Sequence, residues 1–337
     1  MSAAVESIAV LRPNHRLGNT LLLMPLVQAL QERFPQAEIT VVSGSGAAPG
    51  LFRAYERVCA THYLPPALPR EAVKIMRTLR ALRQGSFDLA IDPIVRSRMG
   101  RFLLRYVRAR DRVGFTWGEA RRDRVLTHAA DPRGAPAHFT QAPIWLLRTA
   151  YPADNQAAGI ALRPMDLRLS EEERRHGARR LAATLGIAAP VGSAEWHARP
   201  KVGLFANATG QKLYPLPWWR QLIGCFRGSH IQFVEFIPED ARPRLAAEIP
   251  GVYTPDLRVL GATLAATSLL VVADGGVMHL AEAAGAPVLG LFRTTQPSQY
   301  APLRAGSEGL WAPDASPETV AARMRELLYA AAGRAAG

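Results

Sequence analysis

Short apolar segments alternate with amphipathic, helix-forming segments along most of the chain. The apolar run 7–11 is followed by a helical pattern that reaches about residue 33, and the run 87–92 is followed by another helical pattern. The alternation returns in the second half, where the run 269–273 precedes a helical pattern over 277–284. A helix is the usual crossover between parallel strands. The alternation therefore predicts an α/β fold whose parallel sheets are covered by helices on both faces.

The alternation has one long interruption. Residues 151–164 show no periodicity, and the pattern restarts beyond them. A chain of 337 residues has room for two medium domains, each with a core of its own. We therefore predict two facing Rossmann-like domains, residues 1–160 and residues 161–337. The last helix, expected over 317–332, is a candidate to pack back on the first domain.

Helical periodicity predicts which side chains face the core. In the helix expected over 70–83, the apolar stripe consists of Val73, Met76, Leu79 and Leu82. In the next helix the predicted inner face consists of Met99, Phe102, Leu103, Tyr106 and Val107, and the predicted outer face consists of Arg101, Arg105 and Arg108.

Local signals predict several helix boundaries. Asn19 or Thr20 is expected to cap the first helix, which Pro25 would then kink. Ser170 begins a capping-box pattern at the start of the second half. A further helix is expected near 239–248.

Several classes of protein are excluded by what the chain lacks. No apolar run approaches the ~18–20 residues needed to cross a bilayer, and the N-terminus does not show the pattern of a signal peptide. We therefore expect a cytoplasmic protein. Cys59 and Cys225 are the two cysteines of the sequence, and their positions do not match metal-ligand spacing. The sequence thus predicts neither a disulfide framework nor a metal site.

Positive charge is concentrated in one region. The formal net charge is +13, and residues 74–124 hold 14 Lys and Arg against 5 Asp and Glu. Apart from three lysines, the basic residues are arginines, whose planar fork binds two phosphate oxygens. Such a surface attracts nucleic acid, an anionic membrane or a phosphorylated glycolipid, or it is a solvated face without a partner. Because no recognisable nucleic-acid-binding module accompanies the charge, we do not predict nucleic-acid binding.

The motif with the clearest chemistry follows the buried strand 269–273. Asp274 ends the strand, Gly275 and Gly276 come next, and a helix containing His279 begins there. A helix start presents unpaired N–H groups and the positive end of its dipole, and glycines let a phosphate approach the backbone. Ligands of open α/β sheets bind at the carboxyl ends of strands. The segment is therefore a candidate ligand site, and the alternative is an ordinary strand–turn–helix with a capping aspartate and a packed histidine.

A second polar cluster follows the first strand of the second half. Asn207, Thr209 and Lys212 bring together an amide, a hydroxyl and one of the three lysines. Such groups can clamp a diphosphate. The alternative is a surface loop.

Four segments of the chain together resemble a known family. They are Ile8-Ala-Val-Leu-Arg12 with Arg16-Leu-Gly-Asn-Thr-Leu-Leu-Leu-Met-Pro25, then Phe87-Asp-Leu-Ala-Ile-Asp92, then Lys212-Leu-Tyr-Pro215, and finally Asp274-Gly-Gly-Val-Met-His279 with Pro287-Val-Leu-Gly-Leu-Phe292. They are similar to motifs of the bacterial heptosyltransferases of glycosyltransferase family nine, which build the inner core of lipopolysaccharide.

The resemblance implies GT-B architecture, with the active site between two Rossmann-like domains. The donor would be a nucleotide sugar, typically ADP-heptose, and its transfer would proceed with inversion and without a required metal or other cofactor. The implied donor-binding residues on the second domain are Asn207, Thr209, Lys212, Asp274, Gly275, Gly276 and His279. The resemblance places the acceptor on the first domain. From its charge, we expect the basic region 74–124 to bind an anionic glycolipid acceptor, through Arg96, Arg98 and Arg101, and to make a peripheral contact with the anionic inner membrane.

One position departs from the family pattern at the point where catalysis would occur. An aspartate usually follows the glycine of the first motif, and here that residue is Asn19, whose amide is not basic enough to take a proton. The catalytic candidates are therefore Asp92, at the end of the probable fourth strand, and His15, in the loop after the first strand. The first and fourth strands are neighbours in Rossmann order, and we favour Asp92 as the base. Asn19 would orient the acceptor.

Two alternative functions remain open. A non-catalytic family relative that binds a nucleotide sugar or a glycolipid is favoured by Asn19. A transferase that uses a different nucleotide sugar is favoured by departures such as Leu213 and Tyr214, where the family usually has Arg and Trp.

Overall fold

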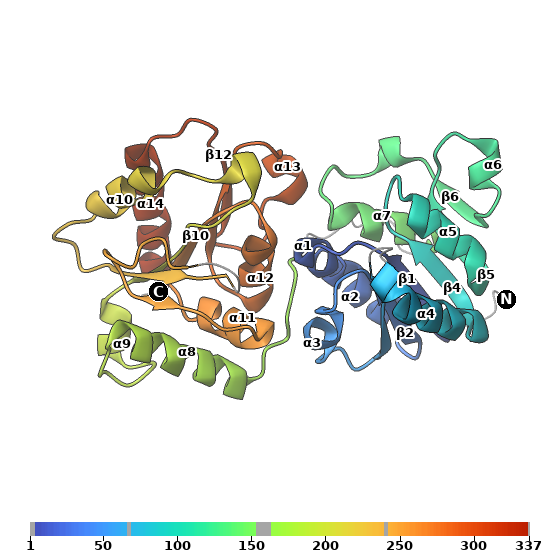
Figure 1. Cartoon of the computed structure of the whole chain (residues 1–337), viewed down its shortest axis with the longest axis horizontal. Coiled ribbons are helices and arrows are strands. Elements are labelled where there is room, and N and C mark those ends of the chain that lie inside the picture. The colour runs from blue at the N-terminus through green and yellow to red at the C-terminus, as the bar shows by residue number, and fades with distance from the viewer. Residues whose placement is uncertain (1–3, 66–68, 153–162, 239–241, 336–337) are drawn as a thin grey trace. The chain divides into compact units, whose positions relative to one another are not determined.

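The computed structural model describes residues 4–65, 69–152, 163–238 and 242–335. The chain divides into two compact units, Met1–Arg163 and Pro164–Gly337 (Figure 1). The predicted domain boundary, between residues 160 and 161, lies outside the described residues. Helices and strands alternate along each unit, which confirms the predicted α/β class.

The first unit is built on a six-stranded parallel sheet with the order β3-β2-β1-β4-β5-β6. Its strands are β1 (Ser7–Arg12), β2 (Glu38–Ser43), β3 (Val58–Tyr63), β4 (Ser86–Asp92), β5 (Arg108–Phe115) and β6 (His128–Ala130). The strand order reverses between β1 and β4, as predicted. Ligands of open α/β sheets bind at such a switch point.

Helices cover both faces of the first sheet (Figure 1). They are α1 (Leu17–Leu21), α2 (Met24–Arg33), α3 (Ala48–Phe52), α4 (Ala72–Gln84), α5 (Arg98–Tyr106), α6 (Ala120–Asp123) and α7 (Gln141–Ala150). On one face, Leu82 of α4 and Leu103 of α5 pack with Leu11 of β1. On the other face, α2 packs against α7.

The start of the first unit corrects two predictions. The expected long helix is two helices, because Pro25 occupies the first turn of α2, where its missing N–H and fixed φ are tolerated. Asn19 and Thr20 do not cap a helix. Both lie inside α1, whose N-cap position is Arg16.

The predicted faces of α4 and α5 are partly wrong. In α4 the sheet covers Leu82, whereas Val73 and Met76 lie on the exposed side. In α5 Met99 and Phe102 are exposed. Arg101, which was expected on the outer face, is buried instead because its guanidinium has backbone and carboxylate partners below the helix.

The second unit is built on a second six-stranded parallel sheet, with the order β12-β11-β10-β7-β8-β9. Its strands are β7 (Lys201–Phe205), β8 (Gln232–Phe236), β9 (Gly251–Val252), β10 (Leu269–Ala273), β11 (Val288–Phe292) and β12 (Glu308–Trp311). The strand order reverses between β7 and β10. These are the two strands that precede the polar segments singled out in the sequence.

The helices of the second unit are α8 (Glu171–Leu185), α9 (Ala194–Ala198), α10 (Leu216–Gly224), α11 (Leu257–Ala265), α12 (Gly276–Ala284), α13 (Pro297–Tyr300) and α14 (Pro317–Ala335). The predicted capping box at Ser170 is present at the start of α8. The helix expected near 239–248 is wrong for residues 242–248, which form turns, and residues 239–241 lie outside the described residues. Val320 and Met324 of α14 pack with Trp219 of α10 in the core of this unit.

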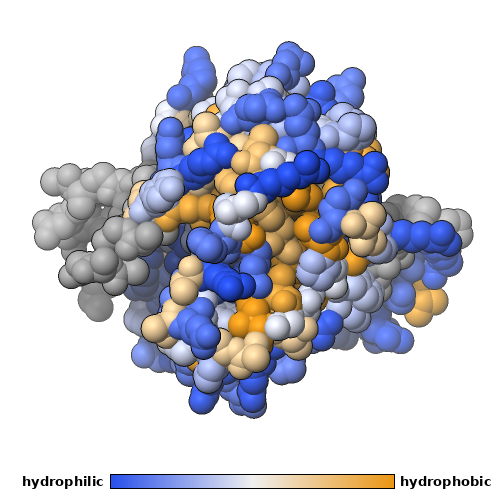
Figure 2. Space-filling view, turned by 90° about the vertical axis from the view of Figure 1, so that its left-hand side faces the viewer, coloured by the Kyte–Doolittle hydropathy of each residue, from blue (hydrophilic) through white to orange (hydrophobic). Residues whose placement is uncertain are grey.

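Hydrophilic and hydrophobic residues are mixed on the face shown in Figure 2, where the hydrophobic ones form a central band. More than half of a folded protein's accessible surface is apolar, so such a band does not by itself mark a site. Among the helices that the structure describes, none has the length and apolar character needed to span a membrane.

Candidate functional site

The first candidate site lies at the carboxyl end of β10 in the second unit. Asp274 follows the strand, and α12 begins at Gly276 after Gly275 at the N-cap position. Gly275 has no side chain to accept a hydrogen bond from the first N–H groups of α12, and the first turn contains no acidic residue. No side chain of α12 itself therefore offsets the positive end of the helix dipole, which is the local geometry that favours an anionic ligand.

Asp274 is the point at which three loops meet. This residue is only 6% exposed. One carboxylate oxygen accepts a hydrogen bond of 2.5 Å from Lys212 Nζ, in the loop after β7, and another of 2.5 Å from the hydroxyl of Thr295, in the loop after β11. The structure thus joins two segments that are 62 residues apart and that the sequence identified separately. Lys212 keeps about a quarter of its side chain exposed beside the start of α12.

The remaining predicted donor residues differ in accessibility. Asn207 is half-buried, and its amide Nδ2 has no hydrogen-bond partner among the described residues. Thr209 is exposed at the start of the turn that carries Lys212. His279 is buried inside α12, with its ring centroid 6.3 Å from that of Tyr300. Buried amide groups usually have a hydrogen-bond partner, so Asn207 is the member of these three whose donor is unused.

The carboxyl end of the first sheet holds the predicted catalytic residues. Asp92 ends β4 and is completely buried, because Gly100 of α5 packs directly on its carboxylate. A Cβ atom at position 100 would come within 2.6 Å of the Asp92 carboxylate. One carboxylate oxygen accepts a hydrogen bond from the Ile94 N–H, and the other has no partner among the described residues. In this arrangement Asp92 cannot contact an acceptor hydroxyl, so the geometry does not favour it as the base.

Burial dominates the electrostatics of Asp92. It raises the pKa of this carboxyl to about 7, although Arg101, the Ile94 N–H and Arg12 act in the opposite direction. Arg12 is itself buried and donates a hydrogen bond of 2.7 Å to Oδ1 of Asn19. Arg12 therefore interacts with two residues: its charge acts on the buried Asp92 carboxyl, and its guanidinium binds Asn19.

His15 has the accessibility that Asp92 lacks. It is exposed, in the loop between β1 and α1. The loop after β2 approaches this segment so closely that a Cβ atom at Gly44 would lie 2.6 Å from the Asn14 backbone. This close approach shapes an apolar pocket of about 190 Å³, which His15 lines with Leu64, Met99 and others.

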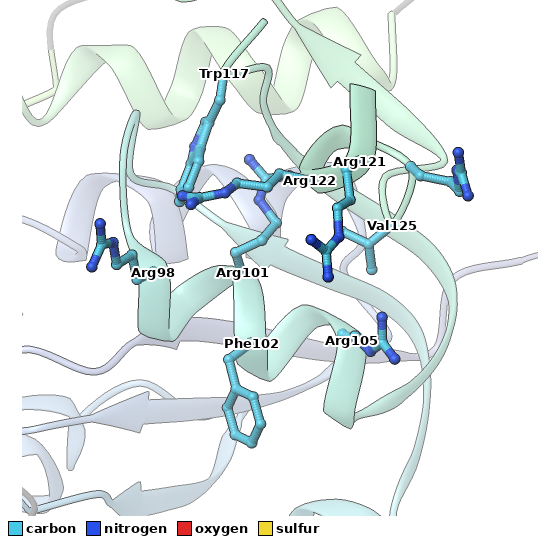
Figure 3. Close-up of a pocket in the computed structure, with 9 residues that line it drawn as sticks. Arg98, Arg101, Phe102, Arg105, Trp117, Arg121, Arg122 and Val125 are labelled. Atoms are coloured by element: carbon cyan, nitrogen blue, oxygen red, sulfur yellow. The ribbon is translucent and has the colours of Figure 1, made fainter. Parts of the chain in front are cut away.

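A second pocket in the first unit is lined mainly by arginines (Figure 3). Its volume is about 820 Å³, and its lining residues are Arg98, Arg101, Phe102, Arg105, Trp117, Arg121, Arg122, Arg124 and Val125. They come from α5, from α6 and from the segments that flank α6. Of the three predicted acceptor residues, Arg98 and Arg101 line this pocket. Arg96 is exposed, and it precedes Arg98 by two residues without lining the pocket.

Arg101 is the buried member of this arginine pocket. Its Nη2 donates a hydrogen bond of 2.6 Å to the Phe115 carbonyl, and its guanidinium carbon lies 5.1 Å from the centre of the Trp117 ring. Arg122 lies 4.9 Å from the centre of the same ring. Nε and Nη1 of Arg101 are buried without a hydrogen-bond partner among the described residues. An arginine held in this way presents a fixed cation to an anionic group.

A family model decides what kind of protein carries these sites. The model described as glycosyltransferase family 9 (heptosyltransferase) matches residues 75–328. The chain belongs to glycosyltransferase family 9. The resemblance seen in the sequence is therefore confirmed, and the activity of the chain is glycosyl transfer.

Solved structures share the fold of this family 9 glycosyltransferase. A glycosyl transferase family 9 structure from Veillonella parvula DSM 2008 has a TM-score of 0.78 at 18% identity and covers 98% of this chain and 99% of that chain. E. coli ADP-heptose LPS heptosyltransferase II has a TM-score of 0.71 at 19% identity and covers 96% and 98%. E. coli heptosyltransferase WaaC with ADP-2-deoxy-2-fluoro heptose has a TM-score of 0.67 at 17% identity and covers 95% and 99%. These likenesses confirm the GT-B fold class. A comparison with curated protein sequences finds no match.

The structure of this glycosyltransferase adds one residue that was not among the predicted site residues. Arg293 directly follows β11. It donates hydrogen bonds of 3.1 Å to the Pro313 carbonyl and 2.9 Å to the Leu213 carbonyl, and its guanidinium carbon lies 4.9 Å from the centre of the Tyr214 ring. Arg293 therefore ties the loop of Lys212 to the carboxyl end of the sheet. No local pattern in the sequence marks it, because its partners are carbonyl groups of other loops.

Proposed function

We propose that this family 9 glycosyltransferase transfers heptose from ADP-heptose to a core acceptor of lipopolysaccharide, with inversion at the sugar. The observation that carries the proposal is the convergence of Lys212 and Thr295 on Asp274, directly before the glycine start of α12. The choice of donor is supported by the E. coli heptosyltransferase whose structure contains an ADP-heptose analogue.

The donor's diphosphate is proposed to lie at the N-terminus of α12. The first N–H groups of the helix would donate to phosphate oxygens, and Lys212 would add a positive charge from the side. The buried Nδ2 of Asn207 would donate another hydrogen bond. As the bond between sugar and diphosphate breaks, negative charge grows on the leaving diphosphate, and these same groups stabilise it.

The acceptor is proposed to be an anionic glycolipid that the arginine pocket holds. Arg101 would contribute a fixed positive charge to the wall of the pocket. Arg98 and Arg122 would add charge from the exposed rim, and Trp117 offers an apolar ring against which a sugar can pack. We place this transfer at the inner face of the inner membrane, where such a lipid-linked acceptor is within reach.

The acceptor hydroxyl must lose its proton as it attacks the sugar. We propose that His15 takes this proton, because it is the exposed member of the catalytic candidates. Asn19 would orient the acceptor through the amide nitrogen that its bond to Arg12 leaves available. Asp92 would act as a positioning residue through the charges of Arg12 and Arg101.

A transfer assay with ADP-heptose and purified core acceptor tests this function. A thermal-shift panel of ADP, UDP, GDP, CDP and dTDP identifies the nucleotide, because a ligand at 100 times its dissociation constant stabilises a protein by about 2.7 kcal/mol. We expect ADP to stabilise the chain most and heptose to be transferred. Stabilisation by another nucleotide would instead indicate a different donor, and binding without transfer would indicate a non-catalytic relative.

A further inference from the structure

Two neighbouring helices of the first unit expose large apolar side chains. Val73 and Met76 of α4 are 69% and 67% exposed, and Met99 and Phe102 of α5 are 46% and 47% exposed. Helical periodicity predicted these four residues for the core, yet the structure places them on the surface. Exposed apolar residues need an explanation when they form one continuous patch.

Met99 and Phe102 line the apolar pocket between α4 and α5, and Val73 and Met76 continue the apolar surface along α4. Ile75 and Leu79 of α4 line this pocket together with Met99 and Phe102 of α5. Residues three apart are neighbours on a helix, so Met76 adjoins Leu79, and Val73 adjoins Met76. Val73, Met76, Met99 and Phe102 therefore form one surface with the pocket at its centre, which we name the α4–α5 face.

The α4–α5 face is surrounded by positive charge. Between residues 70 and 105 there are nine Lys and Arg and three Asp and Glu, and neither α4 nor α5 contains an acidic residue. The exposed cations around the face are Arg70, Lys74, Arg77, Arg80, Arg98 and Arg105. Of these, Lys74 is paired with Glu71, just before α4.

We propose that the α4–α5 face docks on an anionic lipid bilayer. Apolar side chains ringed by Lys and Arg are typical of helices that lie in the membrane interface, because the apolar groups enter the headgroup region while the cations bind anionic lipids. A stable protein–protein interface uses about 20–30 residues on each side and is poor in Lys at its core, so four apolar residues among cations fit a bilayer better.

The docking inference rests on the proposed function, because docking would serve to bring the transferase to a lipid-linked acceptor. Phe102 lines both the apolar pocket and the arginine pocket. An acceptor sugar that projects from a bilayer at the α4–α5 face would therefore arrive beside Arg98 and Arg101. Vesicle binding itself needs neither donor nor acceptor, so it can be measured independently of transfer.

Co-sedimentation of the full chain with vesicles tests the docking. The probe is a vesicle of phosphatidylcholine and phosphatidylglycerol, with pure phosphatidylcholine for comparison. We expect binding to the anionic vesicle, and we expect the double variant Val73→Ser, Met76→Ser to bind at least tenfold more weakly, which corresponds to about 1.4 kcal/mol. The matched control is Tyr329→Ser, which removes a side chain that is 77% exposed on α14 of the second unit. Equal binding by the double variant and the control would overturn the proposal.

Insertion of the apolar side chains is measured separately from binding. Met76→Cys and Tyr329→Cys, each in a chain whose Cys59 and Cys225 are replaced by serine, carry an environment-sensitive fluorophore. The label at position 76 should shift to shorter wavelength with anionic vesicles, and the label at position 329 should not. A position-76 label that stays in water while the protein binds would refute docking through this face and assign the binding to the arginines alone.

Failure of the docking proposal and failure of the proposed function give different results. Transfer to a deacylated acceptor in solution does not require a bilayer. A wild-type chain that transfers sugar to this acceptor but does not bind anionic vesicles would overturn the docking proposal alone. A chain that docks through position 76 but transfers no sugar would overturn the proposed function alone.

Discussion

Replacement of Asp92 by asparagine tests the electrostatics beneath α5. Asp92 is fully buried between β4 and α5, and burial raises the pKa of its carboxyl from 3.8 to about 7. Asp92→Asn keeps the size of the side chain and removes its titration. The change therefore isolates the cost of ionising a carboxyl at this position in the folded chain.

The pKa shift sets the size of the effect. Each pKa unit corresponds to about 1.36 kcal/mol, so a rise of about 3 units means that ionised Asp92 costs the folded chain about 4 kcal/mol relative to its protonated form. The folded chain holds this proton more tightly than the unfolded chain. The resulting stability is complete below about pH 4 and is lost as the pH rises through about 7. Between about pH 5 and about pH 8, the free energy of unfolding should fall by about 2.5 kcal/mol more in the wild type than in Asp92→Asn.

Urea denaturation followed by circular dichroism at these two pH values measures the difference. The control is Asp88→Asn. The Glu6 N–H is the main group that lowers the pKa of Asp88, so this residue stays ionised at both pH values. The difference in unfolding free energy between the control and the wild type should therefore not change with pH. A constant difference between Asp92→Asn and the wild type would refute the argument, because it would mean that Asp92 has the same charge at both pH values.

Three further variants test the proposed roles of individual residues. Lys212→Ala should weaken ADP binding at least about tenfold in titration calorimetry, with Lys74→Ala as the matched control, and unchanged affinity would remove Lys212 from the donor site. His15→Ala should lower kcat by about 10²-fold or more, with the exposed His176→Ala as control, and a smaller loss would remove His15 as the base. The double variant Arg98→Gln, Arg122→Gln should raise the acceptor KM about tenfold, whereas Arg220→Gln in the second unit should not, and an unchanged KM would place the acceptor elsewhere.

The proposed donor site follows from topology, which the sequence predicts. Asp274 and Lys212 each follow a strand of the parallel sheet that the sequence predicted for the second half, and the structure pairs these two strands. The carboxyl ends of such strands meet at the same edge, so two loops far apart in the chain could be assigned to one place before their contact was seen. The contribution of Arg293 could not be predicted, because its partners are carbonyl groups of other loops.

The faces of α4 and α5 show where sequence reasoning stops. Periodicity identifies an apolar sector of a helix, but the part that a sheet covers depends on how the helix is rotated against it. Met76 and Phe102 belong to the apolar sector and lie outside the covered part. Arg101 turns inward because the Phe115 carbonyl and Asp92 lie beneath it, and both belong to other elements. No local pattern contains that information.

Asn19 raises the question of what a carboxylate would do at its position. Oδ1 of Asn19 accepts a hydrogen bond from the buried Arg12, whose charge also acts on Asp92. Asn19→Asp would turn this hydrogen bond into an ion pair, and Arg12 would then be shared by two carboxylates. A carboxylate held in this way is kept ionised and is a weak base, because its proton affinity falls beside the cation. With His15 as the base, we expect Asn19→Asp to leave kcat within about threefold of the wild type in the transfer assay. A rise of about 10²-fold would instead place the base at position 19. Activity that appears only in Asn19→Asp would mean that the wild-type chain binds its ligands without transferring sugar.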